Sequence, residues 1–136
     1  MKKILFVDDD PIAHDLMTGI LKDWNFVSAH SGEEALKILE QEYGFIVITD
    51  IHMPGMTGIE LIHKIREKFP IVQTIVLSST EDTNNILAAY EAGANDFILK
   101  PFDKEKILNT VNNTMEKIKR WENAMGEACM KKDKVW

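Results

Sequence analysis

Short apolar runs alternate along the chain with longer segments in which apolar residues recur every three or four positions. The short runs are rich in β-branched residues, as buried strands are, whereas the longer segments have the spacing of one helix face. The predicted strands are Lys3–Asp8, Phe26–His30, Phe45–Asp50, Thr74–Ser79 and Asp96–Lys100. This alternation predicts an α/β fold, a doubly wound parallel sheet of five strands with helices on both faces.

The ends of the predicted helices carry residues that start and stop helices. Pro11 suits a first turn, and Ser31 with Glu34 forms a capping-box pattern at the next helix. A third helix should end before Pro70, and Gly93 should cap the fourth. The apolar positions that mark the first helix are Ile12, Leu16, Ile20, Leu21 and Trp24.

Polar residues stand where most of the predicted strands end. They are Asp8, Asp9 and Asp10 at the first strand, Asp50 at the third, Ser78 and Ser79 at the fourth, and Lys100 at the fifth. Ligands of doubly wound sheets bind beyond the carboxyl ends of the strands. We therefore expect these side chains to converge on one edge of the sheet.

Carboxylates that gather at one edge repel each other. At a separation of about 5 Å and an effective dielectric constant of about 20, the repulsion is roughly 3 kcal/mol. Either one carboxyl keeps its proton or a cation lies between them. A hard divalent ion with oxygen ligands fits best, namely Mg²⁺ with Mn²⁺ as the alternative. Such an ion, a hydroxyl from Ser78 and an ammonium from Lys100 would together accommodate a phosphoryl group.

Four stretches together resemble the response-regulator receiver domains of two-component signalling, and the chemotaxis regulators among them. They are VDDDP at 7–11, TDIHMPGMTG at 49–58, LSS at 77–79 and EAGANDFILKPF at 91–102. The resemblance runs from near the N-terminus to about residue 120, and it implies a flavodoxin-like sheet with strand order 2-1-3-4-5. We therefore divide the chain into a receiver domain at 1–120 and a C-terminal helical extension or linker at 121–136.

The resemblance implies a role for each matching acidic residue. Asp50 would be the phosphorylation site and form an aspartyl phosphate. Asp8, Asp9, Asp50 and the backbone carbonyl of His52 would hold Mg²⁺, with Asp9 as a direct ligand. The residues at two positions that tune dephosphorylation in the family are His52 and Thr80. The plain alternative for Asp50 is an acid that caps the turn after its strand.

Residues of the fourth and fifth strands receive roles in the same way. Ser78 and Lys100 would contact the phosphoryl group, and their alternatives are a loop hydroxyl and a surface lysine. Phe97 matches the aromatic switch position of the family, although an aromatic residue in a strand also suits simple packing. The Lys100–Pro101 peptide is expected to be cis.

Composition narrows the class of protein. The net charge of −6 argues against binding nucleic acid directly through the overall field. The only cysteine, Cys129, can form no internal disulfide, which suits a reducing compartment. The N-terminal apolar stretch is too short for a signal peptide or a membrane span. We expect a cytoplasmic protein that makes no membrane contact.

The expected function is that of a signalling phosphoacceptor. A histidine kinase or histidine phosphotransfer protein would donate the phosphoryl group to Asp50, and the domain would catalyse only its own phosphorylation and dephosphorylation. One alternative is a phosphatase of the haloacid-dehalogenase type with Asp8 as nucleophile, because Asp8 to Asp10 fits an Asp-x-Asp pattern. Against it, no acidic pair follows Lys100. The other alternative is a receiver that acts as a binding module without phosphorylation.

A heptad-like pattern continues into the C-terminal segment, where a helix should begin near Asp103. Its positions are Ile107, Val111, Thr114, Ile118, Trp121, Met125 and Ala128. This pattern favours an extended helix that serves as a linker to an effector domain or as a dimer contact. The alternative is that its first half packs on the sheet and the rest frays. A homodimer through the face of the fourth and fifth helices is a further expectation.

The histidines show no metal-ligand spacing. We interpret all of them as ordinary surface or loop residues, with one of them bordering the expected site. They are His14, His30, His52 and His63, and His52 is the one at the border.

Overall fold

Five parallel strands form a single sheet in the order β2-β1-β3-β4-β5. A computed structural model describes residues 3–42, 44–79, 81 and 83–129. The strands are β1 (Lys3–Val7), β2 (Asn25–Ala29), β3 (Phe45–Asp50), β4 (Gln73–Ser79) and β5 (Asp96–Lys100). The helices are α1 (Pro11–Ile20), α2 (Gly32–Gln41), α3 (Gly58–Lys68), α4 (Thr83–Ala92) and α5 (Lys104–Cys129). The predicted fold class and strand order are confirmed.

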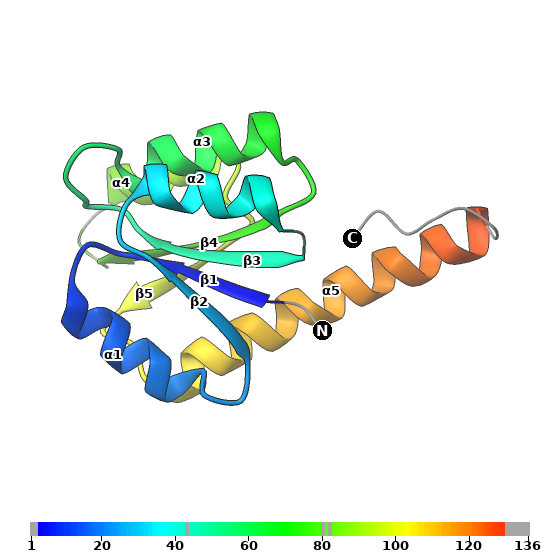
Figure 1. Ribbon diagram of the computed structural model, residues 1–136, viewed down its shortest axis with the longest axis horizontal. Helices are drawn as coiled ribbons and strands as arrows, with labels where there is room; N and C mark the ends of the chain where they lie inside the picture. Colours follow the sequence, from blue (N-terminus) through cyan, green and yellow to red (C-terminus); the bar gives the residue numbers. More distant parts are fainter. Residues whose placement is uncertain (1–2, 43, 80, 82, 130–136) are drawn as a thin grey trace.

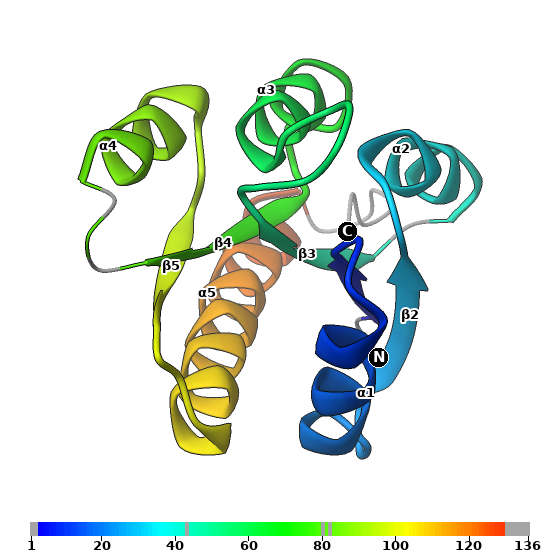
Figure 2. The ribbon, with the colours of Figure 1, turned by 90° about the vertical axis from the view of Figure 1, so that its left-hand side faces the viewer.

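The sheet is covered on both faces, and this explains why its central strands read as continuous apolar runs. Helices α1 and α5 lie on one face, and α2, α3 and α4 lie on the other (Figure 2). Along β1, Ile4 and Phe6 pack in the core of the first face, whereas Leu5 and Val7 pack in the core of the second. All of these side chains are fully buried.

Helix ends follow the local signals in the sequence. The Ser31 hydroxyl accepts a hydrogen bond from the Glu34 amide at 3.1 Å, and the Glu34 carboxylate accepts one from the His30 amide at 3.1 Å. Helix α3 ends at Lys68, ahead of Pro70, and α4 ends just before Gly93, whose φ is +104°. This left-handed conformation suits glycine.

Helix α1 buries only the later part of the apolar pattern that marks it, because Ile20, Leu21 and Trp24 pack in the core whereas the earlier positions do not. Ile12 is 76% exposed and Leu16 is 54% exposed, whereas Met17 and Leu21 are buried. His14 is buried as well, so its interpretation as a surface or loop residue is wrong. His14, Met17 and Leu21 share one side of the helix by their spacing of three and four.

Helix α5 continues well beyond the edge of the sheet, as Figure 1 shows in orange. Ile107, Val111, Thr114 and Ile118 are buried, whereas Trp121 is 59% exposed. The first half of the predicted seam therefore packs on the sheet, and the helix continues without a break to Cys129. The predicted extended helix is confirmed. Within the described ranges, no helix is long and apolar enough to cross a membrane.

Candidate functional site

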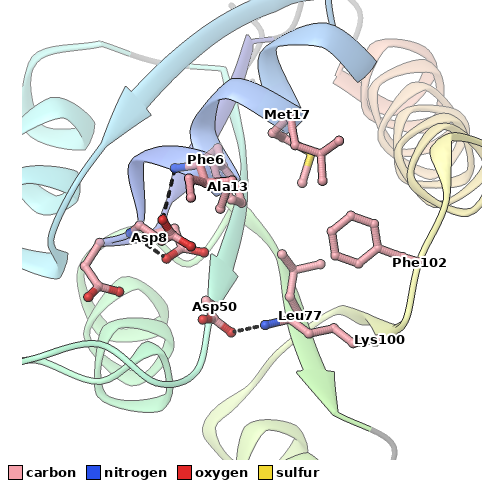
Figure 3. Close-up of a pocket in the computed structure, with 12 residues that line it drawn as sticks. Phe6, Asp8, Ala13, Met17, Asp50, Leu77, Lys100 and Phe102 are labelled. Carbon is pink, nitrogen blue, oxygen red and sulfur yellow. Dashed lines mark hydrogen bonds and ion pairs between the residues drawn. The ribbon is translucent and has the colours of Figure 1, made fainter.

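A cavity of about 470 Å³ opens where the carboxyl ends of β1, β3 and β5 meet. Its polar wall consists of Asp8, Asp9, Asp10, Asp50 and Lys100. Its apolar wall consists of Phe6, Ile12, Ala13, Leu16, Met17, Leu77 and Phe102. Acidic side chains from two strand ends and an amine from a third thus surround one space (Figure 3).

The loop after β1 is held by hydrogen bonds of its own. The Asp8 amide donates to the Ala29 carbonyl at 3.2 Å, which extends the β1–β2 pairing by one residue. The Asp10 amide donates to the Asp8 carboxylate at 3.0 Å. The Asp10 carboxylate in turn caps α1 by accepting from the Ile12 amide at 3.0 Å. Asp10 is therefore the helix cap, and Asp8 is the strand-end acid that this loop orients.

The loop after β3 folds back closely on Asp50. The Gly58 amide donates to the Ile51 carbonyl at 2.8 Å. A Cβ atom at position 58 would lie 2.0 Å from the Asp50 carbonyl oxygen, which leaves room only for glycine. The second glycine of the GMTG turn is thus required by close packing of backbone against the strand end that carries Asp50.

Asp50 and Lys100 form an ion pair across the cavity. Lys100 Nζ lies 3.2 Å from Asp50 Oδ1, and the same oxygen accepts from the Ile51 amide at 3.0 Å. The Asp50 side chain is 14% exposed and that of Lys100 is 42% exposed. The Lys100–Pro101 peptide bond is cis.

The carboxylates of the cavity influence one another. Burial raises the pKa of Asp8, and the negative charges of Asp50 and Asp9 raise it further. The hydrogen bond from the Asp10 backbone and the charge of Lys100 act in the opposite direction. A cation placed among these oxygens would relieve the repulsion, so the donor set fits a hard divalent ion.

The set of side chains is nevertheless sparse for a metal cage. In the part of the chain that the structure describes, no three His, Cys, Asp or Glu side chains are gathered as a metal-binding group. Mg²⁺ usually keeps several waters and uses only one or two carboxylates, supplemented by backbone oxygen. An open site of this kind is compatible with Mg²⁺ chemistry.

The profile of the response regulator receiver domain matches residues 4–112, which is most of the chain. The chain belongs to this family. The match includes β2 to β5, all of β1 except Lys3, and the residues of the cavity wall.

Individual receiver domains and regulators resemble this chain over most of its length. The chemotaxis protein CheY of Listeria monocytogenes is 34% identical over 114 residues, which cover 82% of this chain and 96% of that protein. A response regulator receiver domain protein from Clostridium thermocellum has a crystal structure that superposes with a TM-score of 0.83. Its sequence is 26% identical, and the superposition covers 89% of this chain and 99% of that one.

Several relatives are longer than this receiver domain. The uncharacterized transcriptional regulatory protein YesN of Bacillus subtilis is 36% identical over 126 residues, which cover 88% of this chain. The same match covers only 34% of YesN, so the chain spans about a third of that relative.

The structure brings some of the predicted site residues of the receiver domain together and leaves others apart. Asp8, Asp9, Asp50 and Lys100 line the cavity. Ser78 is buried at the end of β4, outside the cavity wall, and its hydroxyl donates to the Ser79 carbonyl at 3.3 Å.

The remaining predicted residues lie around this centre. His52 is exposed on the loop after β3, and its Nε2 lies 3.4 Å from the Asn85 amide nitrogen on α4. Phe97 on β5 is 50% exposed, so it does not pack in the core in this structure. Thr80 lies outside the described residues.

His14 is the residue of the site that sequence reasoning missed. Its Nε2 lies 2.7 Å from the Asp8 carbonyl oxygen, directly behind the acidic wall. The available signal was its position three residues before Met17 and seven before Leu21, which places it on the buried face of α1.

Proposed function

We propose that this receiver domain accepts a phosphoryl group on Asp50 from a phosphohistidine and thereby switches its interactions with a partner. The observation that carries the proposal is the environment of the Asp50 carboxylate. It lies in the wall of an open cavity, with the Lys100 ammonium 3.2 Å away and the acids of the β1 end, Asp8 and Asp9 among them, in the same wall. The donor would be a histidine kinase or a histidine phosphotransfer protein.

The contacts of Asp50 assign its two oxygens different tasks. Among the described residues, the two hydrogen bonds that the Asp50 carboxylate accepts, from Lys100 and from the Ile51 amide, both involve Oδ1. We therefore assign Oδ2 as the nucleophile. As the O–P bond to Asp50 forms, the N–P bond of the phosphohistidine breaks, and the departing imidazole nitrogen keeps the electron pair. Lys100 offsets negative charge that builds up on the transferring group.

A divalent ion would complete this site. We propose that Asp8, Asp9, Asp50 and the His52 backbone carbonyl hold Mg²⁺, with Mn²⁺ as a substitute. When bound, the ion would neutralise charge on the phosphoryl oxygens and on Asp50. The support is the gathering of Asp8, Asp9 and Asp50 in one cavity wall, because a cation among their oxygens would remove the repulsion between these carboxylates.

The switch that follows would involve Ser78 and Phe97. The Ser78 hydroxyl now donates to the Ser79 carbonyl at 3.3 Å and would have to leave it to reach a phosphoryl oxygen on Asp50. Phe97 is half-exposed on the neighbouring strand and would turn inward as Ser78 moves. The two arrangements would differ at the face of α4, β5 and α5, which also exposes Leu87 and Tyr90.

Exposed apolar residues at the rim of the cavity support a protein as the phosphodonor. Ile12 and Leu16 project from α1 at 76% and 54% exposure, and both line the cavity that contains Asp50. Helix–helix contact at this rim would bury these side chains and bring a partner histidine to the opening.

We also propose how the domain is connected to other domains and to a second copy of itself. The division into a receiver domain at 1–120 and an extension at 121–136 remains our prediction, as does an effector domain joined through this extension. A homodimer would form through the α4–β5–α5 face or the end of α5. The lone cysteine favours the cytoplasm, and the acidic net charge argues against direct nucleic-acid binding by this domain.

Labelling with a small phosphodonor such as acetyl phosphate tests the assignment of Asp50. Asp50→Asn should abolish the mass increase of one phosphoryl group, measured on the intact protein in the presence of Mg²⁺. Asp10→Asn is the matched control, because it makes the same change in the same cavity wall and asparagine still caps a helix. Equal labelling of Asp50→Asn and the parent protein would refute the proposal. Turnover of a phosphate ester that depends on Asp8 would instead favour the phosphatase alternative.

A further inference from the structure

His14 is a buried polar residue that contacts the acidic wall from behind. It belongs to α1, and only 6% of its surface is exposed. Nε2 lies 2.7 Å from the Asp8 carbonyl oxygen, and Nδ1 lies 3.0 Å from Ser28 Oγ on β2. The imidazole therefore joins three elements at the point where the chain leaves β1.

The two contacts determine which ring nitrogen carries the hydrogen of the neutral imidazole. A carbonyl oxygen can only accept, so Nε2 must donate to Asp8. Nδ1 then accepts from the Ser28 hydroxyl. The Asp8 carbonyl thus selects the tautomer, and the Ser28 hydroxyl, which can either donate or accept, fits it by donating to Nδ1.

Aromatic neighbours restrict the orientation of the same ring. The Phe6 ring meets His14 edge-on with 4.9 Å between centroids, and the His30 ring lies at 4.3 Å. Phe6 is fully buried and also lines the cavity. With both nitrogens bonded and rings beside it, His14 is a rigid support for the loop that follows β1.

His14 supports a loop whose acidic side chains repel one another. Asp8, Asp9 and Asp50 line the same cavity wall, so their negative charges repel one another. Left to itself, such a loop would relax by moving its carboxylates apart. The hydrogen bond from His14 fixes the peptide plane between Asp8 and Asp9, and so fixes the direction in which the Asp9 side chain leaves the backbone.

We infer that His14 is a positioning residue of the divalent-ion site, which acts by holding the Asp8–Asp9 peptide so that both carboxylates stay directed toward the ion. The inference rests on the proposed function, because the ion is part of that proposal. Residues that orient metal ligands from behind typically change metal affinity by about 10-fold to 100-fold when they are removed. A histidine that only filled space would have no such effect on metal affinity.

Titration of the full chain with Mn²⁺, followed by electron paramagnetic resonance, tests the inference without measuring activity. The sharp signal of hydrated Mn²⁺ is lost on binding, so the dissociation constant can be read directly. His14→Phe keeps an aromatic ring but removes both nitrogens, and should weaken binding by about tenfold. His14→Gln retains an amide donor near the position of Nε2, and should restore most of the affinity.

A second measurement separates positioning from general destabilisation. At saturating Mg²⁺ the labelling rate of His14→Phe should return close to that of the parent protein, whereas its half-saturating Mg²⁺ concentration should rise. A lowered melting temperature with unchanged Mn²⁺ affinity would overturn the inference. Equal loss of affinity in His14→Phe and His14→Gln would also overturn it, because the donor would then be irrelevant.

Two more variants keep the result decisive. If His14→Phe does not fold, Ser28→Ala replaces it: this variant removes the partner of Nδ1 and should weaken Mn²⁺ binding, and an unchanged affinity would refute the inference. Asp9→Asn should abolish tight binding. If the parent protein does not bind Mn²⁺ or Mg²⁺, the proposed ion site is wrong. If the parent protein binds and the His14 variants bind equally well, the inference alone is wrong.

Discussion

Lys100 Nζ lies 3.2 Å from Asp50 Oδ1, so the last residue of β5 already faces the acid at the end of β3. The contact spans an intervening strand, because β4 lies between β3 and β5 in the sheet. The Lys100 side chain therefore reaches past the end of β4 to Asp50. The ion pair is a pre-formed contact between the proposed acceptor and the cation that would later meet the phosphoryl group.

Replacing Lys100 by methionine should affect chemistry far more than stability. The lysine side chain is 42% exposed, and ion pairs of this kind contribute at most about 1 kcal/mol to the free energy of unfolding. Removal of a positioned cation or donor from a reacting site typically slows the reaction by about 100-fold. Urea unfolding and acetyl phosphate labelling measure the two effects. A large loss of stability with unchanged labelling would contradict the assigned role.

The raised pKa of Asp8 predicts how stability depends on pH in the absence of divalent ions. The causes are burial first and then, among other contributions, the charges of Asp50 and Asp9. The folded protein therefore binds a proton at Asp8 more tightly than the unfolded chain, in which the pKa of this carboxyl is near 3.8. Between 3.8 and the raised folded pKa, the contribution of this group to stability decreases as pH increases.

Asp8→Asn should accordingly be more stable than the parent protein at neutral pH without metal. The substitution removes a negative charge that is desolvated and is repelled by neighbouring carboxylates. The side-chain oxygen of the new asparagine can still accept a hydrogen bond from the Asp10 amide. Melting temperatures across the acidic range should show a flatter profile for the variant, and Mg²⁺ should stabilise it less. A variant that is less stable than the parent at every pH would show that the Asp8 charge is favourable in the folded state.

The positions of the strand-end acids and of the lysine could be predicted from sequence, because they follow once the strands are known to be parallel members of one sheet. Once Phe45–Asp50 and Asp96–Lys100 are strands of one parallel sheet, Asp50 and Lys100 must come to the same edge. The signals for helix ends at Ser31 and Gly93 are similarly local, since they depend on hydrogen bonds within one turn.

The residues that could not be placed depend on packing between elements. Ile12 and Leu16 satisfy the helical spacing but are exposed, whereas α1 buries His14 and Met17, which were not part of the predicted pattern. The spacing of His14 to Met17 indicates its helix face, but no local signal identifies its partners, Ser28 and the Asp8 carbonyl, because these are decided by how α1 lies against the sheet. Hydrophobic spacing predicts a helix face, but it does not predict which groups of neighbouring elements pack against that face.

Gly58→Ala should destabilise the protein and disturb the site together. The added Cβ would lie 2.0 Å from the Asp50 carbonyl oxygen, a backbone atom that cannot move without displacing the end of β3. Overpacking of this kind costs about 1–3 kcal/mol in the free energy of unfolding, and the accompanying shift of Asp50 should slow labelling.

Gly19→Ala is the matched control for that substitution. Gly19 lies within α1, and a methyl group added there would meet no atom within 4 Å beyond its chain neighbours and the backbone of its own helix. Alanine is favoured over glycine in a helix by about 0.5–1 kcal/mol, so this variant should be more stable and should label normally. Chemical denaturation distinguishes the two variants. Equal stability of Gly58→Ala and the parent would mean that the β3–α3 loop adapts without strain.

Trp121 provides a test of the proposed contact between copies through the end of α5. It continues the seam of buried residues that ends with Ile118, but it is 59% exposed in the isolated chain. If a second copy covers it, Trp121→Glu should shift the protein toward the monomer in sedimentation at increasing concentration. The melting temperature at low concentration should change little, because an exposed residue contributes little to the monomer. Asn123→Glu adds the same charge to an exposed position off the seam and should leave self-association unchanged. A parent protein that stays monomeric at all concentrations, or two variants that behave alike, would exclude this contact.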